Sequence, residues 1–371
     1  MRRTVITASL SLLVALGYSQ NIHQDYTITD QTSISCTPII SQGKTGTCWS
    51  FSTTSFIESE ITRLGKGSVD LSELYQVRNT YLDKAQNYIL RQGTAQFSEG
   101  ALAHDVMNSV RKYGIIPQKS YTGFSISQEK KYNHQKLIKL LKGMVDNAVE
   151  YKILSKNWWK SYNAILDIYI GKKPESFTHN GKKYTPIQFA KELGIDPDNY
   201  ITLTSFTHHP MYSSFILEIP DNFSNGTYHN ITLSEFQEVV DTALKQGYTI
   251  SWDGDVGEVG FSRKNGLAIL TDKKERKNVF SEYQIEKKVT QESRQREFEN
   301  YNTTDDHLMH IVGKGVDQKG KSYYKIKNSW GTGGAQNGYV YMSEAYFRMK
   351  TVSILIHKDG IPKNIKDKLS L

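Results

Sequence analysis

The order of two hydrophobic patterns along the chain constrains the fold more than any other feature of the sequence. Apolar residues recur at helical spacing within residues 48–113, and the stop signals Gly65 and Gly114 follow two of these runs. From residue 307 onward, runs of β-branched and aromatic residues are typical of strands. Helices and strands that occupy separate stretches of a chain indicate an α+β protein with two adjoining subdomains.

Three helices are expected in the first half of the chain, each with its own start or stop signal. The first runs from Cys48 to Leu64 and ends at a glycine, and the third runs from about Ala101 to Tyr113. Between them, Ser72 has the hydroxyl group that favours a helix N-cap. Residues 20–45 show neither a helical nor a strand period, so we expect them to be irregular.

The remaining segments are expected to add an insertion, one more helix and a surface excursion. Residues 125–200 are rich in Lys and Tyr and have a single helical pattern, so we interpret them as an insertion packed on the main body. Residues 233–245 have an amphipathic helical pattern between strand-like segments at 201–217 and 248–261. Residues 262–304 are charged and rich in Gln, which is typical of a surface segment.

The N-terminus has the order of features found in secretory signal peptides. Two arginines precede the apolar run Val5–Leu16, and small residues follow it before Gln20. A helix that spans a bilayer needs about 20 apolar residues, so this run is too short to be one. We expect residues 1–19 to be removed on export, with membrane contact only during that step. The mature protein, residues 20–371, is then periplasmic or extracellular.

The charge of the chain does not favour nucleic acid as a partner. The sequence has 46 basic and 38 acidic residues, and its net charge of +8 falls to +6 without Arg2 and Arg3. This excess is spread over many short lysine runs, which is typical of a solvated surface. The weaker hypothesis is that the lysine-rich insertion binds nucleic acid, with the aromatic residues at 151–162.

The cysteine and histidine content argues against a metal site. Cys36 and Cys48 are the only cysteines in the sequence, too few for a disulfide scaffold or a thiolate zinc site. His208 and His209 are interpreted as part of an exposed loop. His310 is expected in the core, on the opposite face of its strand from the histidine three residues before it. We therefore expect neither a metal nor a cofactor.

The stretch 42–51 has the features of a cysteine nucleophile. Cys48 lies where coil is expected to become helix, and the amides and dipole of a helix N-terminus favour an anion such as a thiolate. Gln42 precedes it and has an amide donor that can face the oxyanion formed when a thiolate attacks a carbonyl. The pair therefore predicts attack on an acyl carbon.

Two later segments supply the partners that such a nucleophile needs. His307 begins an expected buried strand and is the candidate base. Asn328 ends another strand, where its side-chain oxygen can accept a hydrogen bond from the imidazole and fix the tautomer, with Trp330 covering that bond. Nucleophile, base, orienting group and oxyanion donor together are the roles required for acyl transfer by a cysteine.

These motifs resemble those of the papain-like cysteine peptidases. Three matching motifs occur in the family's order: Gln42 with Cys48-Trp49, His307 with Gly313 and Gly315, and Asn328-Ser329-Trp330-Gly331. The resemblance implies that Cys48 is the nucleophile, His307 the base and acid, Asn328 the orienting group and Gln42 the oxyanion donor. It also implies a papain-like fold, with a helical subdomain at about 38–124, a strand-rich subdomain at about 201–371, and the active-site cleft between them.

Within that superfamily, the middle of the chain resembles bleomycin hydrolase and aminopeptidase C. The similar stretches include Gly100–Pro117 and Trp252–Gly257, and the resemblance implies that Gly100 contacts the substrate backbone. Ala101 stands where that family has a second glycine. The chain ends at Leu371, about where the family's C-terminal arm, which restricts cleavage to free N-termini, would begin. Aminopeptidase and endopeptidase activity therefore both stay open.

The sequence as a whole predicts an exported cysteine peptidase that hydrolyses peptide bonds. Peptides are the expected substrates. The alternative is a catalytically silent peptide-binding or adhesion module on the same scaffold. The presence of residues for all four roles favours the enzyme.

Overall fold

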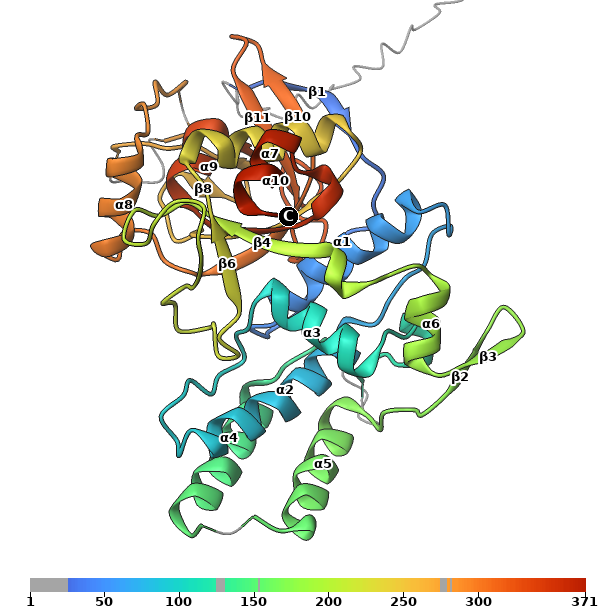
Figure 1. Ribbon diagram of the computed structural model, residues 1–371. Helices are drawn as coiled ribbons and strands as arrows, with labels where there is room; N and C mark the ends of the chain where they lie inside the picture. Colours follow the sequence, from blue (N-terminus) through green and yellow to red (C-terminus); the bar gives the residue numbers. More distant parts are fainter. Residues whose placement is uncertain (1–25, 125–130, 153, 274–278, 281) are drawn as a thin grey trace, which may run out of the picture.

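The computed structural model describes residues 26–124, 131–152, 154–273, 279–280 and 282–371. The expected signal peptide lies outside these ranges. Figure 1 shows a helix-rich part at the bottom and a part built on a large sheet at the top, with helix α1 at their junction. No helix in the described part of the chain combines the length and hydropathy of a membrane-spanning segment.

The first three helices follow the expected pattern. They are α1 (Cys48–Arg63), α2 (Glu73–Leu90) and α3 (Ala103–Tyr113). The Ser72 hydroxyl caps α2, as predicted. Gly114 ends α3 with φ at +79°, where a Cβ atom would lie 2.2 Å from the backbone of a neighbouring segment. Only glycine fits both the backbone conformation and the space at that position.

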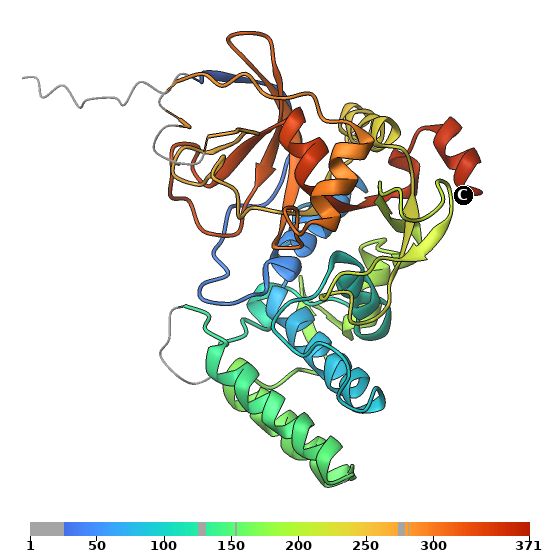
Figure 2. The same cartoon turned by 90° about the vertical axis from the view of Figure 1, so that its left-hand side faces the viewer.

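Residues 125–200 contain more regular structure than the single helix we expected. The expected helix is α4 (Gln135–Glu150), and α5 (Lys156–Ile170) lies beside it, so that the two project from the body (Figure 2). Strands β2 (Phe177–His179) and β3 (Lys182–Tyr184) and helix α6 (Pro186–Glu192) follow. Helix α5 was not predicted because its buried face is narrow and consists of Tyr162, Leu166 and Ile170.

The strand-rich part is built on one sheet. Its described strands follow the order β5-β6-β4-β13-β7-β10-β11-β12-β9-β8, and neighbours are antiparallel except in the pairs β4–β6 and β9–β12. The bounds are β4 (Tyr200–Thr204), β5 (Ser214–Ile216), β6 (Thr227–Asn230), β7 (Ile250–Gly254), β8 (Phe261–Ser262), β9 (Leu267–Ala268), β10 (His307–Asp317), β11 (Ser322–Lys327), β12 (Tyr339–Ser343) and β13 (Thr351–His357). This arrangement and the helical part together confirm the α+β fold class.

One strand of this sheet comes from the segment that we expected to be irregular. Strand β1 (Ile28–Ser33) pairs antiparallel with β10, with a register shift between Asp30 and Thr32. The expectation for residues 20–45 was therefore wrong at this point. Most of β1 is exposed, so its side chains show no apolar alternation, and it is the backbone pairing with β10 that makes it a strand.

Helices on the sheet include α7 (Leu233–Lys245), which was predicted, and three that were not: α8 (Gln291–Glu299), α9 (Glu344–Lys350) and α10 (Lys363–Leu369). Short 3₁₀ turns occur at Gln118–Ser120, Pro197–Asn199 and Lys358–Gly360. Helix α8 contradicts the reading of residues 262–304 as a surface excursion. Arg294 in α8 is fully buried and donates hydrogen bonds of 2.8 and 3.0 Å to two backbone carbonyls.

Helix α1 packs closely against the middle of the sheet because its facing side chains are small and polar. The hydroxyls of Ser52 and Thr53 lie 3.3 and 3.2 Å from the hydroxyl of Ser251 on β7. The Ser55 hydroxyl lies 3.0 Å from Nδ1 of His310 on β10, which is buried in the core as expected. This packing brings the first residue of α1 to the start of β10.

Candidate active site

The thiol of Cys48 lies at the junction of the helical and strand-rich parts. Cys48 is the first residue of α1 and is 8% exposed, and neither it nor Cys36 forms a disulfide. The backbone amides of Leu308 and Trp49 hydrogen-bond its sulfur. Since Leu308 follows His307 directly, the thiol lies at the start of the strand that presents the imidazole. Cys48 lines a cleft of about 780 Å³ with residues from both parts of the molecule.

The imidazole of His307 is held by Asn328 in one tautomer. His307 Nε2 lies 2.9 Å from Asn328 Oδ1, which also accepts a 2.7 Å hydrogen bond from the Ser329 amide. Because an amide oxygen only accepts, Nε2 of the imidazole must carry the proton. Nδ1 is therefore the basic nitrogen, the one required to take a proton from a thiol.

Trp330 covers the bond between His307 and Asn328. The Trp330 and His307 rings lie 4.6 Å apart between centroids, with 31° between their planes. His307 and Asn328 are only 4% and 3% exposed. The hydrogen bond is therefore shielded from water, as the sequence indicated, and a shielded bond restricts the ring more strongly than one in solvent.

Gln42 is fixed by the same segment that carries Asn328. The Ser329 hydroxyl donates a 2.6 Å hydrogen bond to Gln42 Oε1, and the Gln42 backbone amide donates to the Ser329 carbonyl at 2.9 Å. One hydrogen of Gln42 Nε2 goes to the Thr45 carbonyl at 2.7 Å, which leaves the second for another acceptor. Ser329 is a positioning residue that sequence reasoning passed over, although it lies inside the Asn-Ser-Trp-Gly motif.

The glycine that follows Gln42 allows this loop to fold closely. Gly43 has φ at +68°, and a Cβ there would lie 2.4 Å from the Tyr132 carbonyl oxygen. A side chain at this position would push the loop away from the site. Gly43 therefore helps to fix the conformation of the loop that carries Gln42.

Gly100 lines the cleft, but its backbone groups already have partners. Its amide donates a 3.2 Å hydrogen bond to the Ser98 hydroxyl, and its carbonyl accepts from the Lys84 ammonium group. A substrate backbone that paired with Gly100 would have to replace these bonds. The structure thus places Gly100 at the cleft and leaves its role in binding the substrate backbone a prediction.

Burial opposes a charge on either member of the Cys48–His307 pair. Burial raises the pKa of Cys48 to about 12; the amides of Leu308 and Trp49 lower it in part, and the nearby carboxylates Asp305 and Asp221 raise it further. Burial also lowers the pKa of His307 to about 4, although the hydrogen bond that the imidazole donates to Asn328 acts to raise it. Burial thus opposes the thiolate that the helix N-terminus was expected to favour, and the charge of Cys48 stays a prediction.

The consequence is that the two groups must change charge together. A thiolate alone and an imidazolium alone are each unfavourable in this environment. Transfer of the proton from sulfur to Nδ1 would create both charges in one step, as an ion pair. Such a pair stays neutral overall between the two pKa values. Proton transfer from this thiol to an imidazole is therefore most favourable when it accompanies formation of a new bond to sulfur.

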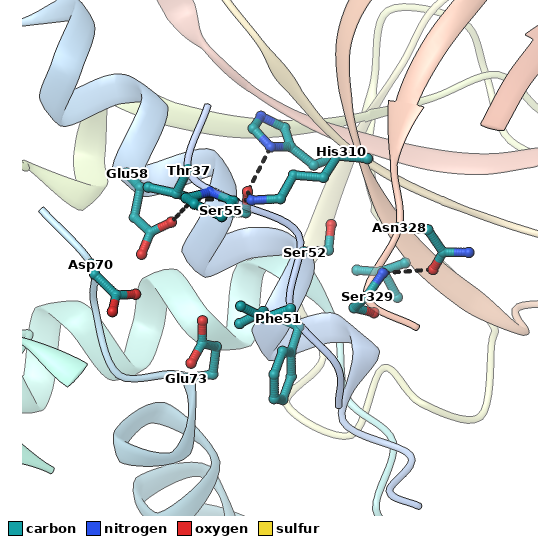
Figure 3. A pocket seen from close by; sticks show the side chains of 14 residues that line it. Thr37, Phe51, Ser52, Ser55, Glu58, Asp70, Glu73, His310, Asn328 and Ser329 are labelled. Atoms are coloured by element: carbon teal, nitrogen blue, oxygen red, sulfur yellow. Dashed lines mark hydrogen bonds between the residues drawn. The ribbon is translucent and has the colours of Figure 1, made fainter. Parts of the chain in front are cut away.

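A cavity of about 350 Å³ lies behind the site, between α1, α2 and the sheet (Figure 3). Glu58 and Glu73 line it, and burial raises the pKa of Glu58 to about 7 and that of Glu73 as well. Lys327, next to Asn328 in the chain, donates to the Ser55 hydroxyl at 2.8 Å and to the Thr37 hydroxyl at 3.0 Å. This network joins the segment that carries Asn328 to the helical part.

In the described part of the chain, one group of side chains has the arrangement of a metal site. The ligand atoms of His208, His209 and Glu218 lie within 4.8 Å of one another on the surface. Both imidazoles face the Glu218 carboxylate, at 3.2 and 2.7 Å, and Gln295 Nε2 lies 3.0 Å from His208 Nδ1. Because the Gln295 amide donates to His208 Nδ1, the proton of the His208 ring is on Nε2, which donates to Glu218. Hydrogen bonds therefore explain why these side chains lie together.

Comparison with known proteins identifies the class that this fold and site define. The model of the papain family of cysteine proteases matches residues 24–157, and the model of the peptidase C1-like family matches residues 94–371. The protein is a papain-like cysteine peptidase. It belongs to the peptidase C1-like family, whose match covers most of the chain.

Similar proteins place the chain near the aminopeptidase C branch. Aminopeptidase W of Lactobacillus delbrueckii subsp. lactis is 22% identical, over 98% of this chain and 90% of that protein. Aminopeptidase C of Lactococcus lactis subsp. lactis is 24% identical, over 87% of this chain and 81% of that protein. The crystal structure of PepW from Lactobacillus rhamnosis shares the fold, with a TM-score of 0.72, 19% identity, and coverage of 92% and 84%.

Proposed function

We propose that this peptidase acts through Cys48, His307 and Asn328, with Gln42 as oxyanion donor, and that it is exported. The observation that carries the proposal is the shielded hydrogen bond from His307 Nε2 to Asn328 Oδ1, because it leaves Nδ1 as the basic nitrogen, while the Cys48 thiol interacts with the backbone of Leu308, the next residue in the chain. The substrates are peptides, since the relatives are peptidases.

The geometry supports a two-step hydrolysis. The Cys48 thiol gives its proton to His307 Nδ1 as sulfur attacks the peptide carbonyl carbon. The spare Gln42 Nε2 hydrogen and the Cys48 amide, which has no partner within its helix, bind the oxyanion. The C–N bond breaks and the leaving amine takes the proton from Nδ1. Water then gives a proton to Nδ1 and attacks the thioester, which releases the acid and restores the thiol.

The relatives bear on the choice between aminopeptidase and endopeptidase activity. Because they are named aminopeptidases, they favour cleavage at free N-termini by this protein as well. A silent peptide-binding module is disfavoured, because the chain belongs to a peptidase family and His307 has the hydrogen bond to Asn328 that a base needs.

The test is the pH dependence of Cys48 reactivity and of peptide hydrolysis. Both rates are expected to be nearly constant from about pH 5 to 8 and to fall about tenfold per pH unit below about pH 4. The sign follows from the lowered pKa of His307: once the imidazole is protonated, it cannot accept the thiol proton. Iodoacetamide alkylation, located by mass spectrometry, and cleavage of a neutral peptide measure this.

Circular dichroism at each pH separates loss of activity from acid unfolding. A folded protein whose alkylation rate stays unchanged down to pH 3 would contradict the assignment of His307 as the base. Alkylation at Cys36 provides an internal reference, because that thiol is half-buried and lies 3.5 Å from the Tyr339 hydroxyl, away from the imidazole.

Export has its own test. The arginines, apolar run and small residues of positions 1–19 motivate the proposal. N-terminal sequencing of the protein from its own cells should give Gln20 as the first residue. A cell-associated protein that retains Met1 or starts at Arg2 would overturn it.

A further inference from the structure

One residue, Glu99, joins the segment around the nucleophile to the loop at residues 97–101. Glu99 Oε2 accepts a 2.5 Å hydrogen bond from the Gly46 amide, and the Glu99 carbonyl accepts one of 2.9 Å from the Trp49 indole. The two donors belong to residues on either side of Cys48 in the chain. Glu99 therefore holds the segment that carries the thiol both before and after the nucleophile.

The two segments approach each other closely at Gly46. A Cβ atom at this position would lie 3.1 Å from the Cβ atom of Glu99, which is tighter than an ordinary van der Waals contact. Gly46 and Glu99 line the same cleft as Cys48. The absence of a side chain at Gly46 thus allows the Glu99 carboxylate to reach the backbone amide.

The loop at residues 97–101 is itself fixed to the helical part. The ammonium group of Lys84, on α2, donates to the Gly100 carbonyl, and the Gly100 amide donates to the Ser98 hydroxyl at 3.2 Å. Ala101 is buried at the end of this loop. Glu99 therefore extends from a loop with its own anchors, and its contact with Gly46 restrains the segment before the nucleophile.

The peptide group between Thr45 and Gly46 is held at both of its polar atoms. Its N–H, which belongs to Gly46, donates to Glu99. Its carbonyl, which belongs to Thr45, accepts a 2.7 Å hydrogen bond from Gln42 Nε2. Because a peptide group is planar, fixing the direction of its N–H also fixes the direction of its carbonyl. Glu99 therefore sets the direction of the acceptor to which the Gln42 amide is anchored.

The two hydrogens of the Gln42 amide have linked directions. The amide is planar, so the hydrogen bond to the Thr45 carbonyl also determines where the second hydrogen points. The Ser329 hydroxyl holds Gln42 Oε1 at 2.6 Å, and the Thr45 hydroxyl donates to the Gln42 carbonyl at 2.8 Å. A rotation of the Thr45–Gly46 peptide group would remove one of these restraints and redirect the second hydrogen.

We propose that Glu99 is a positioning residue for the oxyanion donor: its carboxylate fixes the Thr45–Gly46 peptide group, which fixes the direction of the Gln42 amide. This inference rests on the proposed roles of Cys48 and Gln42. A carboxylate has no proton to donate, so Glu99 acts through Gln42 and does not bind the oxyanion itself. Because the oxyanion forms only as the carbonyl is attacked, the effect belongs to kcat more than to KM.

Glu99→Ala is expected to lower kcat for a neutral peptide about tenfold and to change KM less than about twofold, because loss of a whole oxyanion donor costs about 10²–10³-fold and here the donor is only misdirected. Glu99→Gln keeps an oxygen acceptor for the Gly46 amide. It should restore kcat to within about threefold of the wild type, since a neutral acceptor forms a weaker bond than a charged one. Glu150→Ala, at an exposed glutamate that ends α4, is the matched control and should leave kcat unchanged.

Alkylation by iodoacetamide separates this effect from displacement of the thiol. Sulfur attacks the CH₂ carbon, iodide leaves, the thiol proton passes to the base, and no oxyanion forms. The alkylation rate at Cys48 should therefore be the same in Glu99→Ala and the wild-type protein, although kcat differs. If the two rates fell in parallel, Glu99 would hold the thiol or the fold instead of the Gln42 amide, and the inference would be overturned.

A double-mutant cycle tests the route through Gln42. In a Gln42→Ala background, Glu99→Ala should lower kcat no further, because no amide remains to be directed. Two effects that multiply, or a wild-type kcat for Glu99→Ala, overturn the inference. Circular dichroism checks that each variant is folded. If Glu99→Ala is not, Glu99→Leu replaces it, since leucine fills similar space without an acceptor.

Failure of this inference is distinct from failure of the proposed function. If Cys48→Ala keeps full peptide hydrolysis, the proposed nucleophile is wrong, whatever the Glu99 variants do. If Cys48→Ala is inactive while Glu99→Ala has the wild-type kcat, the proposed function stands and the positioning role of Glu99 is lost.

Discussion

Cys48→Ala is expected to lower kcat/KM for peptide hydrolysis by about 10⁴-fold or more, because removal of the nucleophile of such a constellation removes nearly all of its catalysis. The side chain is small and 8% exposed, so the fold should tolerate the change. Hydrolysis followed by chromatography, with circular dichroism as a check of folding, measures the effect.

Cys36→Ala is the matched control for this experiment. Cys36 is half-buried and contacts the Tyr339 hydroxyl through its sulfur. This variant should retain activity and still be alkylated at Cys48. If Cys48→Ala kept wild-type activity, or Cys36→Ala lost it, the nucleophile would have been assigned to the wrong cysteine.

Trp49→Ala is expected to destabilise the protein by about 3–5 kcal/mol, the usual effect of truncating a buried tryptophan. Trp49 is fully buried, and its indole N–H donates a 2.9 Å hydrogen bond to the Glu99 carbonyl. It thereby joins the start of α1 to the loop that carries Gly100. Urea unfolding followed by circular dichroism measures the change in the free energy of unfolding.

Trp49→Phe separates packing from hydrogen bonding at this position. It keeps an aromatic ring but leaves the Glu99 carbonyl without its donor, so a loss of about 1–3 kcal/mol is expected. Equal stabilities of Trp49→Ala and the wild-type protein would show that this side chain does not support the cleft. A lower hydrolysis rate in the folded Trp49→Phe protein would show that the loop position matters for activity.

The geometry of the candidate site could be anticipated from the sequence because its motifs are local. Cys48 starts a helix with a clear apolar period, and Asn328 follows a short strand of aromatic and β-branched residues. The hydrogen bond between His307 and Asn328 was predicted and is present. The burial that opposes a charge on Cys48 was not predicted, because burial depends on the whole fold.

Other features could not be predicted because tertiary contacts determine them. Strand β1 is defined by its pairing with β10, and the charged helix α8 is held by a buried Arg294 whose side chain the sequence pattern assigned to the surface. The carboxyl groups that line the cleft with Cys48 were not predicted for the same reason. Asp221 and Asp305 are far apart in the sequence, and no local pattern indicates that they share a cleft.

Because α1 meets the start of β10, the two proposed catalytic groups come together only after the chain has been synthesised and has folded. Sulfur and imidazole come from opposite ends of the chain and from different halves of the molecule. During synthesis, the ribosome releases the cysteine long before the histidine, so the nascent enzyme cannot digest its neighbours. In the proposed mechanism, peptidase activity is therefore acquired only when both halves of the chain have been made and have folded together.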